Sequence, residues 1–286
     1  MGRLAGAIER DGTGPLKNEG RKDLMIRVTN LVKKYGPITA VRDVSFEVKA
    51  GEIFAFLGPN GAGKTTTIKI LTTLLRPTSG EVEVDGLNPS NNQSEVRKRF
   101  GIVFQDPSLD DQLTAYENMD LHGALYSVPK KVRRARIEEL LNLFQLWDRR
   151  ADLVKNFSGG MRRRLEIARC MLHTPKIIFL DEPTLGLDPQ TRNQLWTHIR
   201  RLNEQEGITV FLTTHYMDEA ERMANRIAII DHGAIVAQGT LTELKEKTGA
   251  DSLEAAFLQL TGFSIREEET GQVERMRQMA RMFRRR

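Results

Sequence analysis

The sequence predicts an α/β fold with a parallel central sheet, an N-terminal antiparallel β subdomain and an inserted α-helical subdomain. Three observations lead to this prediction. Short uninterrupted apolar runs alternate with helical stretches, which is typical of parallel strands covered on both faces. Near the N-terminus, apolar and polar residues alternate, as in half-buried antiparallel strands. Between Leu113 and Lys155 the pattern is helical throughout and interrupts the other two.

The antiparallel subdomain is expected at the start of the folded sequence, near Met25, after a flexible tail at residues 1–24. Residues 25–36 and 40–48 alternate between apolar and polar, and a turn at Lys49–Gly51 leads to the first uninterrupted apolar run. These segments predict a small antiparallel sheet.

The central sheet is predicted from apolar segments that helices separate. The strands are expected at 53–57, 102–104, 177–180, 208–212 and 227–230. The helices are expected at 64–75, 159–172, 190–204 and 216–224. After the last strand, the pattern predicts a hairpin that turns at Asp231–Gly233.

The helical subdomain is predicted at about 113–158, inserted between two halves of the α/β core. Thr114 and Glu117 fit a capping box, which places the start of a helix there. Further apolar residues recur at helical spacing and are expected to share one face: Ile137, Leu140, Leu141, Phe144 and Trp147.

The composition is that of a soluble globular protein with a sizeable core, since 40% of the 286 residues are hydrophobic and 28% are charged. Apolar runs are too short to span a bilayer, and the first residues lack the apolar segment of a secretory signal. The single cysteine, Cys170, excludes an internal disulfide framework. We therefore expect a cytoplasmic protein in which Cys170 is a buried thiol.

The net charge of +5 arises at the C-terminus, where residues 272–286 hold six arginines and one glutamate. The rest of the chain is balanced, so the totals do not require a basic groove for nucleic acid. Apolar residues recur at helical spacing among these arginines. Two interpretations remain, a basic helix on an anionic membrane surface and a solvated terminus.

A glycine-rich loop, "GPNGAGKTT" at 58–66, follows an apolar strand and opens a helix. It matches the pattern of a phosphate-binding loop, in which backbone N–H groups and a helix N-terminus surround phosphates. Lys64 is expected to neutralise the β- and γ-phosphates, and Thr65 to offer its hydroxyl to Mg²⁺. The expected nucleotide-binding residues here are Gly58, Pro59, Asn60, Gly61, Ala62, Gly63, Lys64, Thr65 and Thr66.

Polar residues follow three other predicted strands. Asp181 is expected to hold Mg²⁺, and Glu182 to orient or deprotonate an attacking water, whereas in isolation this pair would be a loop acid or a cap. His215 can donate to a γ-phosphate oxygen, with a structural histidine as the alternative. Gln105 is a candidate ligand of Mg²⁺ or of the attacking water, and a polar strand end is the alternative.

The order of these motifs resembles an ABC transporter nucleotide-binding domain over roughly residues 26–240. The resemblance implies a P-loop NTPase, ABC-type ATPase core that binds ATP and Mg²⁺. It makes Lys64 and Thr65 part of Walker A, Asp181 part of Walker B and Glu182 the catalytic carboxylate. Gln105 would be the Q-loop glutamine, His215 the switch histidine, Asp188 a D-loop residue, and Tyr35 the ring that stacks on adenine; by itself, Tyr35 could equally be a surface turn residue. The domains implied are 25–240 for nucleotide binding and 241–286 for a C-terminal extension with a basic tail.

The resemblance also explains the second glycine-rich segment, "NFSGGMRRR" at 156–164. In the family, two domains pair head to tail, and Ser158, Gly159 and Gly160 of one face ATP held by the other. Phe157 and Met161 depart from the usual L-S-G-G-Q, but we expect ATP-driven closure to survive because Ser158 and Gly160 are retained. The arginines at 162–164 are expected on the exposed side of the following helix, with Leu165, Ile167 and Met171 toward the core.

Within this family, "EPTLGLDPQTR" and "THYMDEAERMANRIAIIDHG" resemble the daunorubicin-resistance-like branch of ABC-2 exporters. This implies a separate transmembrane permease, a second copy of the chain, and a peripheral place on the cytoplasmic side of the membrane. Leu121, Leu125 and Tyr126 are candidates for contacting the permease, with a place in the core as the alternative. The rival function is a soluble ABC ATPase acting on nucleic acid or the ribosome; no nucleic acid is expected.

Overall fold

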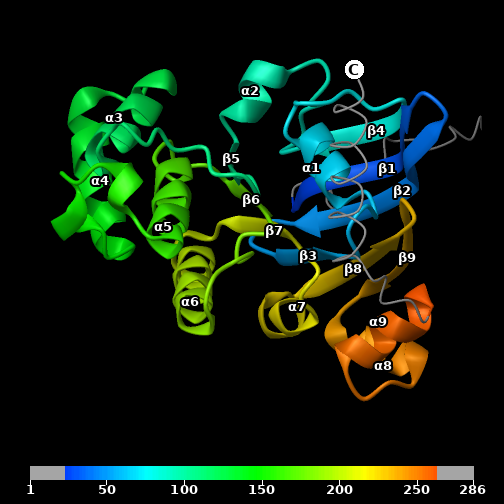
Figure 1. Cartoon of the computed structure of the whole chain (residues 1–286). Coiled ribbons are helices and arrows are strands. Elements are labelled where there is room, and N and C mark those ends of the chain that lie inside the picture. The colour runs from blue at the N-terminus through cyan, green and yellow to red at the C-terminus, as the bar shows by residue number, and fades with distance from the viewer. Residues whose placement is uncertain (1–22, 263–286) are drawn as a thin grey trace, which may run out of the picture.

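A computed structural model describes residues 23–262, which form two sheets with helices packed around them (Figure 1). The central sheet has six strands in the order β5-β6-β7-β3-β8-β9. Its neighbouring strands are parallel except β8 and β9, which form the predicted hairpin. The strands are β3 (Ile53–Leu57), β5 (Phe100–Val103), β6 (Ile177–Asp181), β7 (Thr209–Thr214), β8 (Arg226–Asp231) and β9 (Ala234–Gly239). The predicted mostly parallel sheet is confirmed.

The smaller sheet is antiparallel, with the order β2-β1-β4. β1 (Leu24–Tyr35) and β2 (Ile38–Lys49) are the two predicted strands, and β1 begins one residue inside the predicted tail. The third strand, β4 (Ser79–Val84), was not predicted. Only Val82 and Val84 of its six residues are buried, so its apolar signal is short, and its pairing with β1 is a tertiary contact.

The helices of the α/β core are α1 (Lys64–Leu71), α2 (Gln93–Arg97), α5 (Gly159–Cys170), α6 (Pro189–Glu206) and α7 (Met217–Met223). The chain continues through α8 (Leu241–Thr248) and α9 (Leu253–Thr261), which pack beside α7 and β9. Four of these helices were predicted, and α1 ends earlier than expected, at Leu71.

The central sheet is buried on both faces, which explains its uninterrupted apolar strands. In β3, the side chains of Ile53, Ala55 and Leu57 join a cluster with residues of α5 and α6. The alternate residues Phe54 and Phe56 join a second cluster with the antiparallel sheet and α1. The sheet is therefore packed between two layers, which fixes the positions of the loops at its strand ends.

The predicted helical insertion lies between β5 and β6 in the chain and consists of α3 (Ala115–Leu125), α4 (Lys130–Leu143) and two short 3₁₀ turns at Trp147–Arg149 and Val154–Asn156. Figure 1 shows α3 and α4 at the end of the molecule opposite the antiparallel sheet. The capping box of Thr114 and Glu117 is present. Four members of the predicted apolar face are buried, whereas Trp147 is half-buried.

Cys170 is buried as expected, and burial raises the pKa of its thiol to about 12. Within residues 23–262, no helix has the length and apolar character that crossing a membrane requires. The predictions for most of the N-terminal tail and for the basic segment at 272–286 lie outside the described residues.

Candidate functional site

The loop between β3 and α1 is held close to the surrounding backbone at two of its glycines. A Cβ on Gly58 would lie 2.3 Å from the Ile230 carbonyl oxygen, and one on Gly63 would lie 2.6 Å from the Ala40 oxygen. Gly63 also has a φ of 107°, in the left-handed region that side chains disfavour. As the N-cap of α1, Gly63 offers no side-chain cap, and the first turn of α1 holds no acidic residue. The N–H groups at this helix start are therefore oriented to accept an anion.

Lys64 is buried beneath this loop, with 5% of its surface exposed. Its Nζ lies 2.7 Å from the Gly58 carbonyl oxygen, 3.2 Å from that of Pro59 and 3.2 Å from Glu182 Oε1. The loop carbonyls and Glu182 thus hold the ammonium group against the loop that precedes α1. Positive charge and helix N–H groups together are suited to a polyphosphate.

Asp181 lies at the end of β6, 1% exposed. Its Oδ1 accepts hydrogen bonds from Thr213 Oγ1 at 2.6 Å and from Thr65 Oγ1 at 3.4 Å. Burial raises the pKa of this carboxyl group, while the two hydroxyl donors act in the opposite direction. A carboxylate and a hydroxyl at this distance are oxygen donors that fit Mg²⁺, which completes its shell with water and phosphate oxygens.

Glu182 lies one residue on and has a φ of 48°, an uncommon conformation for a residue other than glycine. This backbone places Oε1 within 3.2 Å of both Lys64 Nζ and His215 Nδ1. The His215 contact is close in distance, but its angle does not give an aligned hydrogen bond. Burial opposes the charged form, yet His215 and Lys64 outweigh it and hold the pKa of Glu182 below its ordinary value. Glu182 is thereby kept ionised and able to accept a proton or orient a water.

Gln105 and His215 reach the same edge of the sheet from the strands on either side of β6. Gln105 follows β5 and His215 follows β7, and both strands flank β6. Because the carboxyl ends of parallel strands meet at one edge, these residues lie on the side of Asp181 and Glu182. The side chain of Gln105 is exposed, and its backbone carbonyl accepts a hydrogen bond from Arg163 at 3.2 Å.

Tyr35 lies at the end of β1, where it pairs with Ile38 across the hairpin. Its ring is 45% exposed, and Lys33 Nζ lies 5.1 Å from the ring centre. An exposed, cation-flanked ring is available for stacking, so adenine binding by Tyr35 stays a prediction.

The second glycine-rich segment forms the start of α5. Ser158 is its N-cap, and Ser158 Oγ accepts from the Met161 N–H at 3.2 Å. A Cβ on Gly160 would lie 2.4 Å from Thr191 Cγ2, whereas one on Gly159 would meet open space. Thr191 in turn donates to Asp188, the N-cap of α6. Gly160 is thus packed against the start of α6, whereas Ser158 and Gly159 face outward.

The expected exposure of the arginines at 162–164 is wrong. Arg163 is only 7% exposed, and Arg162 and Arg164 are half-buried. Arg164 donates to the Phe144 carbonyl, while Arg162 and Arg163 bond to loops on either side of α5. This burial is possible because the charge of Arg163 is paired with that of Glu166, one helical turn further on. Leu165, Ile167 and Met171 are buried, as predicted.

Thr213 is a site residue that the sequence analysis missed. It bonds Asp181 through its hydroxyl, and its backbone carbonyl accepts from the Glu182 N–H. Two threonines at the end of an otherwise apolar strand were the available signal.

Comparison with known proteins gives consistent matches. Residues 41–185 match the family model described as ABC transporter. The daunorubicin/doxorubicin resistance ATP-binding protein DrrA of Streptomyces peucetius is 46% identical over 228 residues, 80% of this chain and 69% of that protein. The linearmycin resistance ATP-binding protein LnrL of Bacillus subtilis (strain 168) is 40% identical over 243 residues, 85% of this chain and 76% of that protein.

Solved structures show the same similarity. An ATP-binding subunit of an ABC transporter superposes with a TM-score of 0.77 at 30% identity, over 83% of this chain and 100% of that one. A dimeric ATP-binding cassette, MJ0796 bound to ADP and Pi, gives a TM-score of 0.68 at 33% identity, over 76% of this chain and 99% of that one.

Proposed function

The chain belongs to the ABC transporter family of ATP-binding domains, which hydrolyse ATP, and on that premise we propose that it powers export through a separate ABC-2-type permease. Two relatives support this proposal, because DrrA and LnrL are both named as ATP-binding proteins of drug or antibiotic resistance. The cargo class proposed is drug-like or antibiotic-like compounds, with lipid or polysaccharide as further possibilities. The nucleotide site, with Lys64 and Glu182 in contact, is the observation that carries the proposal.

In this proposal, the residues act on ATP in distinct ways. The start of α1 and Lys64 bind the phosphates, and Thr65, Asp181 and Gln105 hold Mg²⁺, which neutralises phosphate charge. Glu182 takes a proton from the attacking water or orients it, and His215, beside Glu182, contacts the γ-phosphate. Thr213 fixes Asp181 in its position.

A second copy of the chain is proposed to complete each site. Ser158, Gly159 and Gly160 start α5 with an outward-facing serine and glycine, a second helix end suited to an anion. The dimeric cassette among the structural relatives supports a pair of copies. Loss of the γ-phosphate on hydrolysis would remove the bridge between the copies.

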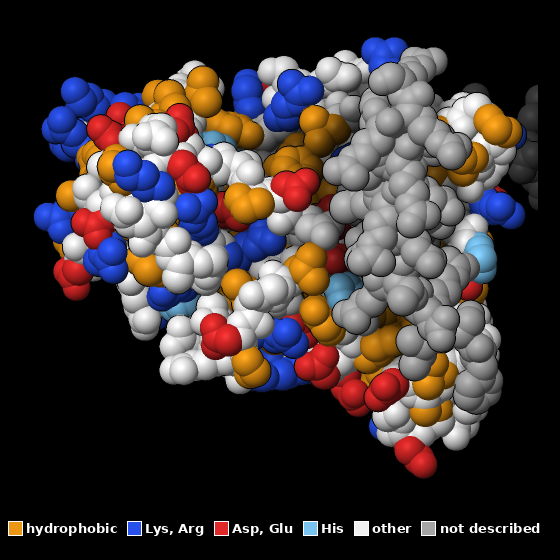
Figure 2. Space-filling model, in the orientation of Figure 1, with side chains coloured by type: hydrophobic (Ala, Val, Ile, Leu, Met, Phe, Trp, Pro, Cys, Tyr) orange, Lys and Arg blue, Asp and Glu red, His pale blue; other side chains and the backbone are white. Residues whose placement is uncertain are grey.

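The permease is proposed to dock on α3, and the chain to lie at the cytoplasmic side of the membrane. Leu125 is 75% exposed and Leu121 is 50% exposed, large values for leucine side chains. Tyr126 is no longer a candidate, because its ring stacks on that of His173 with centroids 3.9 Å apart. On the face that Figure 2 shows, Lys and Arg side chains at this end of the molecule are interspersed with Asp and Glu, whereas the rival nucleic-acid function would favour a uniformly basic patch.

Co-expression with the candidate permease tests export. We expect the chain to sediment with membranes only when the permease is present. The double variant Leu121→Ser with Leu125→Ser should weaken that association about tenfold or more. The purified double variant should still hydrolyse ATP. Val132→Ser, a change at a 56% exposed residue of α4, is the matched control. A chain that stays in the soluble fraction with nucleic acid, whatever permease is present, would contradict the proposal.

A further inference from the structure

The middle of α5 holds the loop that carries Gln105. Arg163 NH1 donates to the Phe104 carbonyl at 2.6 Å, and Arg163 NH2 donates to the Gln105 carbonyl at 3.2 Å. Because Arg163 is almost fully buried, these contacts are shielded from water. Two successive carbonyls bound by one guanidinium fix the direction of the backbone at Gln105.

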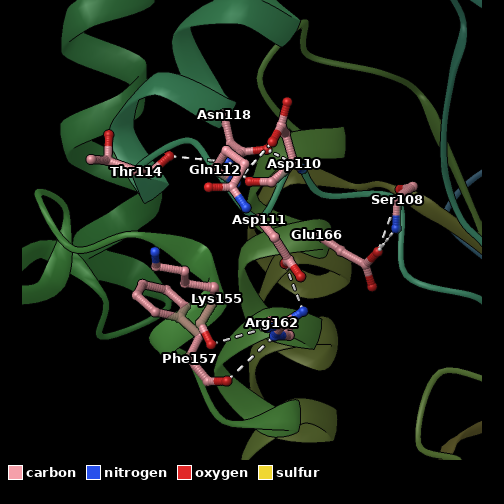
Figure 3. A network of polar contacts seen from close by, with 10 residues as sticks. All are labelled: Ser108, Asp110, Asp111, Gln112, Thr114, Asn118, Lys155, Phe157, Arg162 and Glu166. Atoms are coloured by element: carbon pink, nitrogen blue, oxygen red, sulfur yellow. Dashed lines mark hydrogen bonds and ion pairs between the residues drawn. The ribbon is translucent and has the colours of Figure 1, made fainter.

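Glu166 completes this anchor one helical turn further on. Its Oε2 lies 3.0 Å from Arg163 NH1, and its Oε1 accepts from the Ser108 N–H at 2.7 Å. Glu166 is 2% exposed. Removing a charge pair from water costs free energy, which hydrogen bonds to the remaining polar atoms of the pair offset. Here Arg163 and Glu166 both make those hydrogen bonds with the loop that carries Gln105. Figure 3 shows Glu166 directed toward Ser108.

Arg162, the neighbour of Arg163, ties α5 to the segment that precedes Ser158. Its guanidinium lies 2.7 Å from Asp111 Oδ1 and donates to the carbonyls of Phe157 at 3.3 Å and Lys155 at 3.2 Å. Figure 3 shows Arg162 between Asp111 and the 155–157 segment. The loop carrying Gln105 and the loop leading to Ser158 are therefore fastened to successive residues of one helix.

We propose that Arg163 is a positioning residue that couples the two nucleotide sites of the dimer by tying the Gln105 loop to the helix that begins at Ser158. This rests on the proposed function, in which Gln105 serves the chain's own nucleotide and Ser158 serves the nucleotide of the second copy. A helix moves as a rigid body, so a shift of its first turn carries the bound carbonyls of Phe104 and Gln105 with it. ATP bound by one copy thereby alters the position of Gln105 at the other site.

The test uses the full chain with ATP and Mg²⁺. For Arg163→Met we expect kcat to fall about tenfold or more, because small misplacements at a catalytic site are costly, while KM for ATP changes little. The Hill coefficient for ATP should fall toward one. Arg163→Lys should recover part of the lost kcat, since an ammonium reaches one carbonyl but not both.

Arg164→Met is the matched control, because Arg164 is the next residue of α5 and bonds Phe144 rather than the Gln105 loop. It should retain the wild-type Hill coefficient. If Arg164→Met lowers kcat and the Hill coefficient as much as Arg163→Met, the effect belongs to α5 in general and the inference is wrong.

A double variant, Arg163→Met with Glu166→Leu, separates positioning from stability. Replacing both members of a buried charge pair with apolar residues commonly preserves folding, so its melting temperature should stay close to that of the wild type. We still expect low kcat and no cooperativity. Wild-type kinetics in this folded double variant would overturn the inference.

The Glu182→Gln chain distinguishes this inference from the proposed function. It should dimerise in ATP, and the same chain carrying Arg163→Met should also dimerise, because Lys64 and Ser158 are intact. If Glu182→Gln alone stays monomeric, the shared site is absent and both proposals fail. If it dimerises and Arg163→Met keeps wild-type cooperativity, only the inference about Arg163 fails.

Discussion

At the scale of single residues, the site depends on how buried charges are balanced. Lys64 and Glu182 are both nearly inaccessible, and each is the other's counter-charge. An isolated buried charge would change its protonation state, whereas a paired one stays ionised. The contact with His215 adds to the same effect at Glu182. The carboxylate of Glu182 is thus ionised because of neighbours that lie far away in sequence.

The lowered pKa of Glu182 predicts a particular dependence of stability on pH. Burial opposes ionisation, but His215 and Lys64 dominate, so the folded pKa lies below that of the unfolded chain. The ionised form then stabilises the fold at pH values above the unfolded pKa, and this contribution is lost as the pH falls through the folded pKa. Melting temperatures of the wild type and Glu182→Gln should differ near neutral pH and converge in acid. Parallel curves across that range would contradict the assignment.

At the scale of elements, α3 is fastened to the core through aromatic rings. The rings of His122 in α3 and of Tyr126, which caps the end of α3, have centres 4.8 Å apart, and Tyr126 stacks on His173, which follows α5. His173 Nε2 lies 2.9 Å from the Phe100 carbonyl oxygen in β5. The helical insertion is therefore linked through His173 to β5, the strand that leads to Gln105.

The buried ring of His122 predicts that the fold loses stability in acid. Burial, with the nearby charge of Arg169, lowers the pKa of His122 to about 3, and His122 Nε2 has no hydrogen-bond partner. The unfolded chain binds this proton near pH 6.5, so stability is complete above that value and declines as the pH falls toward 3. His122→Phe should reduce the loss of unfolding free energy between pH 7.5 and pH 5 by roughly 1–2 kcal/mol in urea titrations.

The same measurement on His173→Phe provides a comparison. Burial also lowers the pKa of His173, but the hydrogen bond of its ring with the Phe100 carbonyl acts in the opposite direction. An unchanged pH dependence in His122→Phe would mean that the ring of His122 is protonated in the fold.

Several elements were predictable from sequence, and others were not, for physical reasons. The strands β3, β6 and β8 are apolar on both faces, so their signal is independent of partners. The capping box at Thr114 is a local interaction within four residues. By contrast, β4 has little apolar signal and is defined by pairing with β1. The burial of Arg163 depends on carbonyls some 58 and 59 residues away in sequence.

At the scale of the whole molecule, the two glycine-rich helix starts lie in different parts of the fold. Lys64 lies at the start of α1 beside β3, and Ser158 lies at the start of α5 beside the helical insertion. In the proposed dimer, the start of α1 in one copy and the start of α5 in the other hold one polyphosphate from both sides.

Complementation between inactive chains tests this arrangement. Lys64→Ala removes the phosphate-binding ammonium, and Ser158→Arg blocks the helix start offered to the partner. Each variant alone should hydrolyse ATP at about a hundredth of the wild-type rate or less. Their mixture should recover activity, because a mixed dimer contains one site with Lys64 from one copy and Ser158 from the other. A mixture as inactive as its components would exclude head-to-tail sharing. Lys69→Ala, the same substitution at an exposed lysine of α1, is the control and should leave ATP hydrolysis unchanged.

The sequence by itself determined the α/β class, the glycine-rich loop that opens a helix, and the carboxylates at the end of β6, because each depends on residues adjacent in the chain. Only the tertiary structure decided that Thr213 holds Asp181, that Lys64 and His215 both meet Glu182, and that Arg163 is buried against the Gln105 loop. Those contacts join residues separated by tens of positions, and their strength comes from burial, which exists only after the layers have packed.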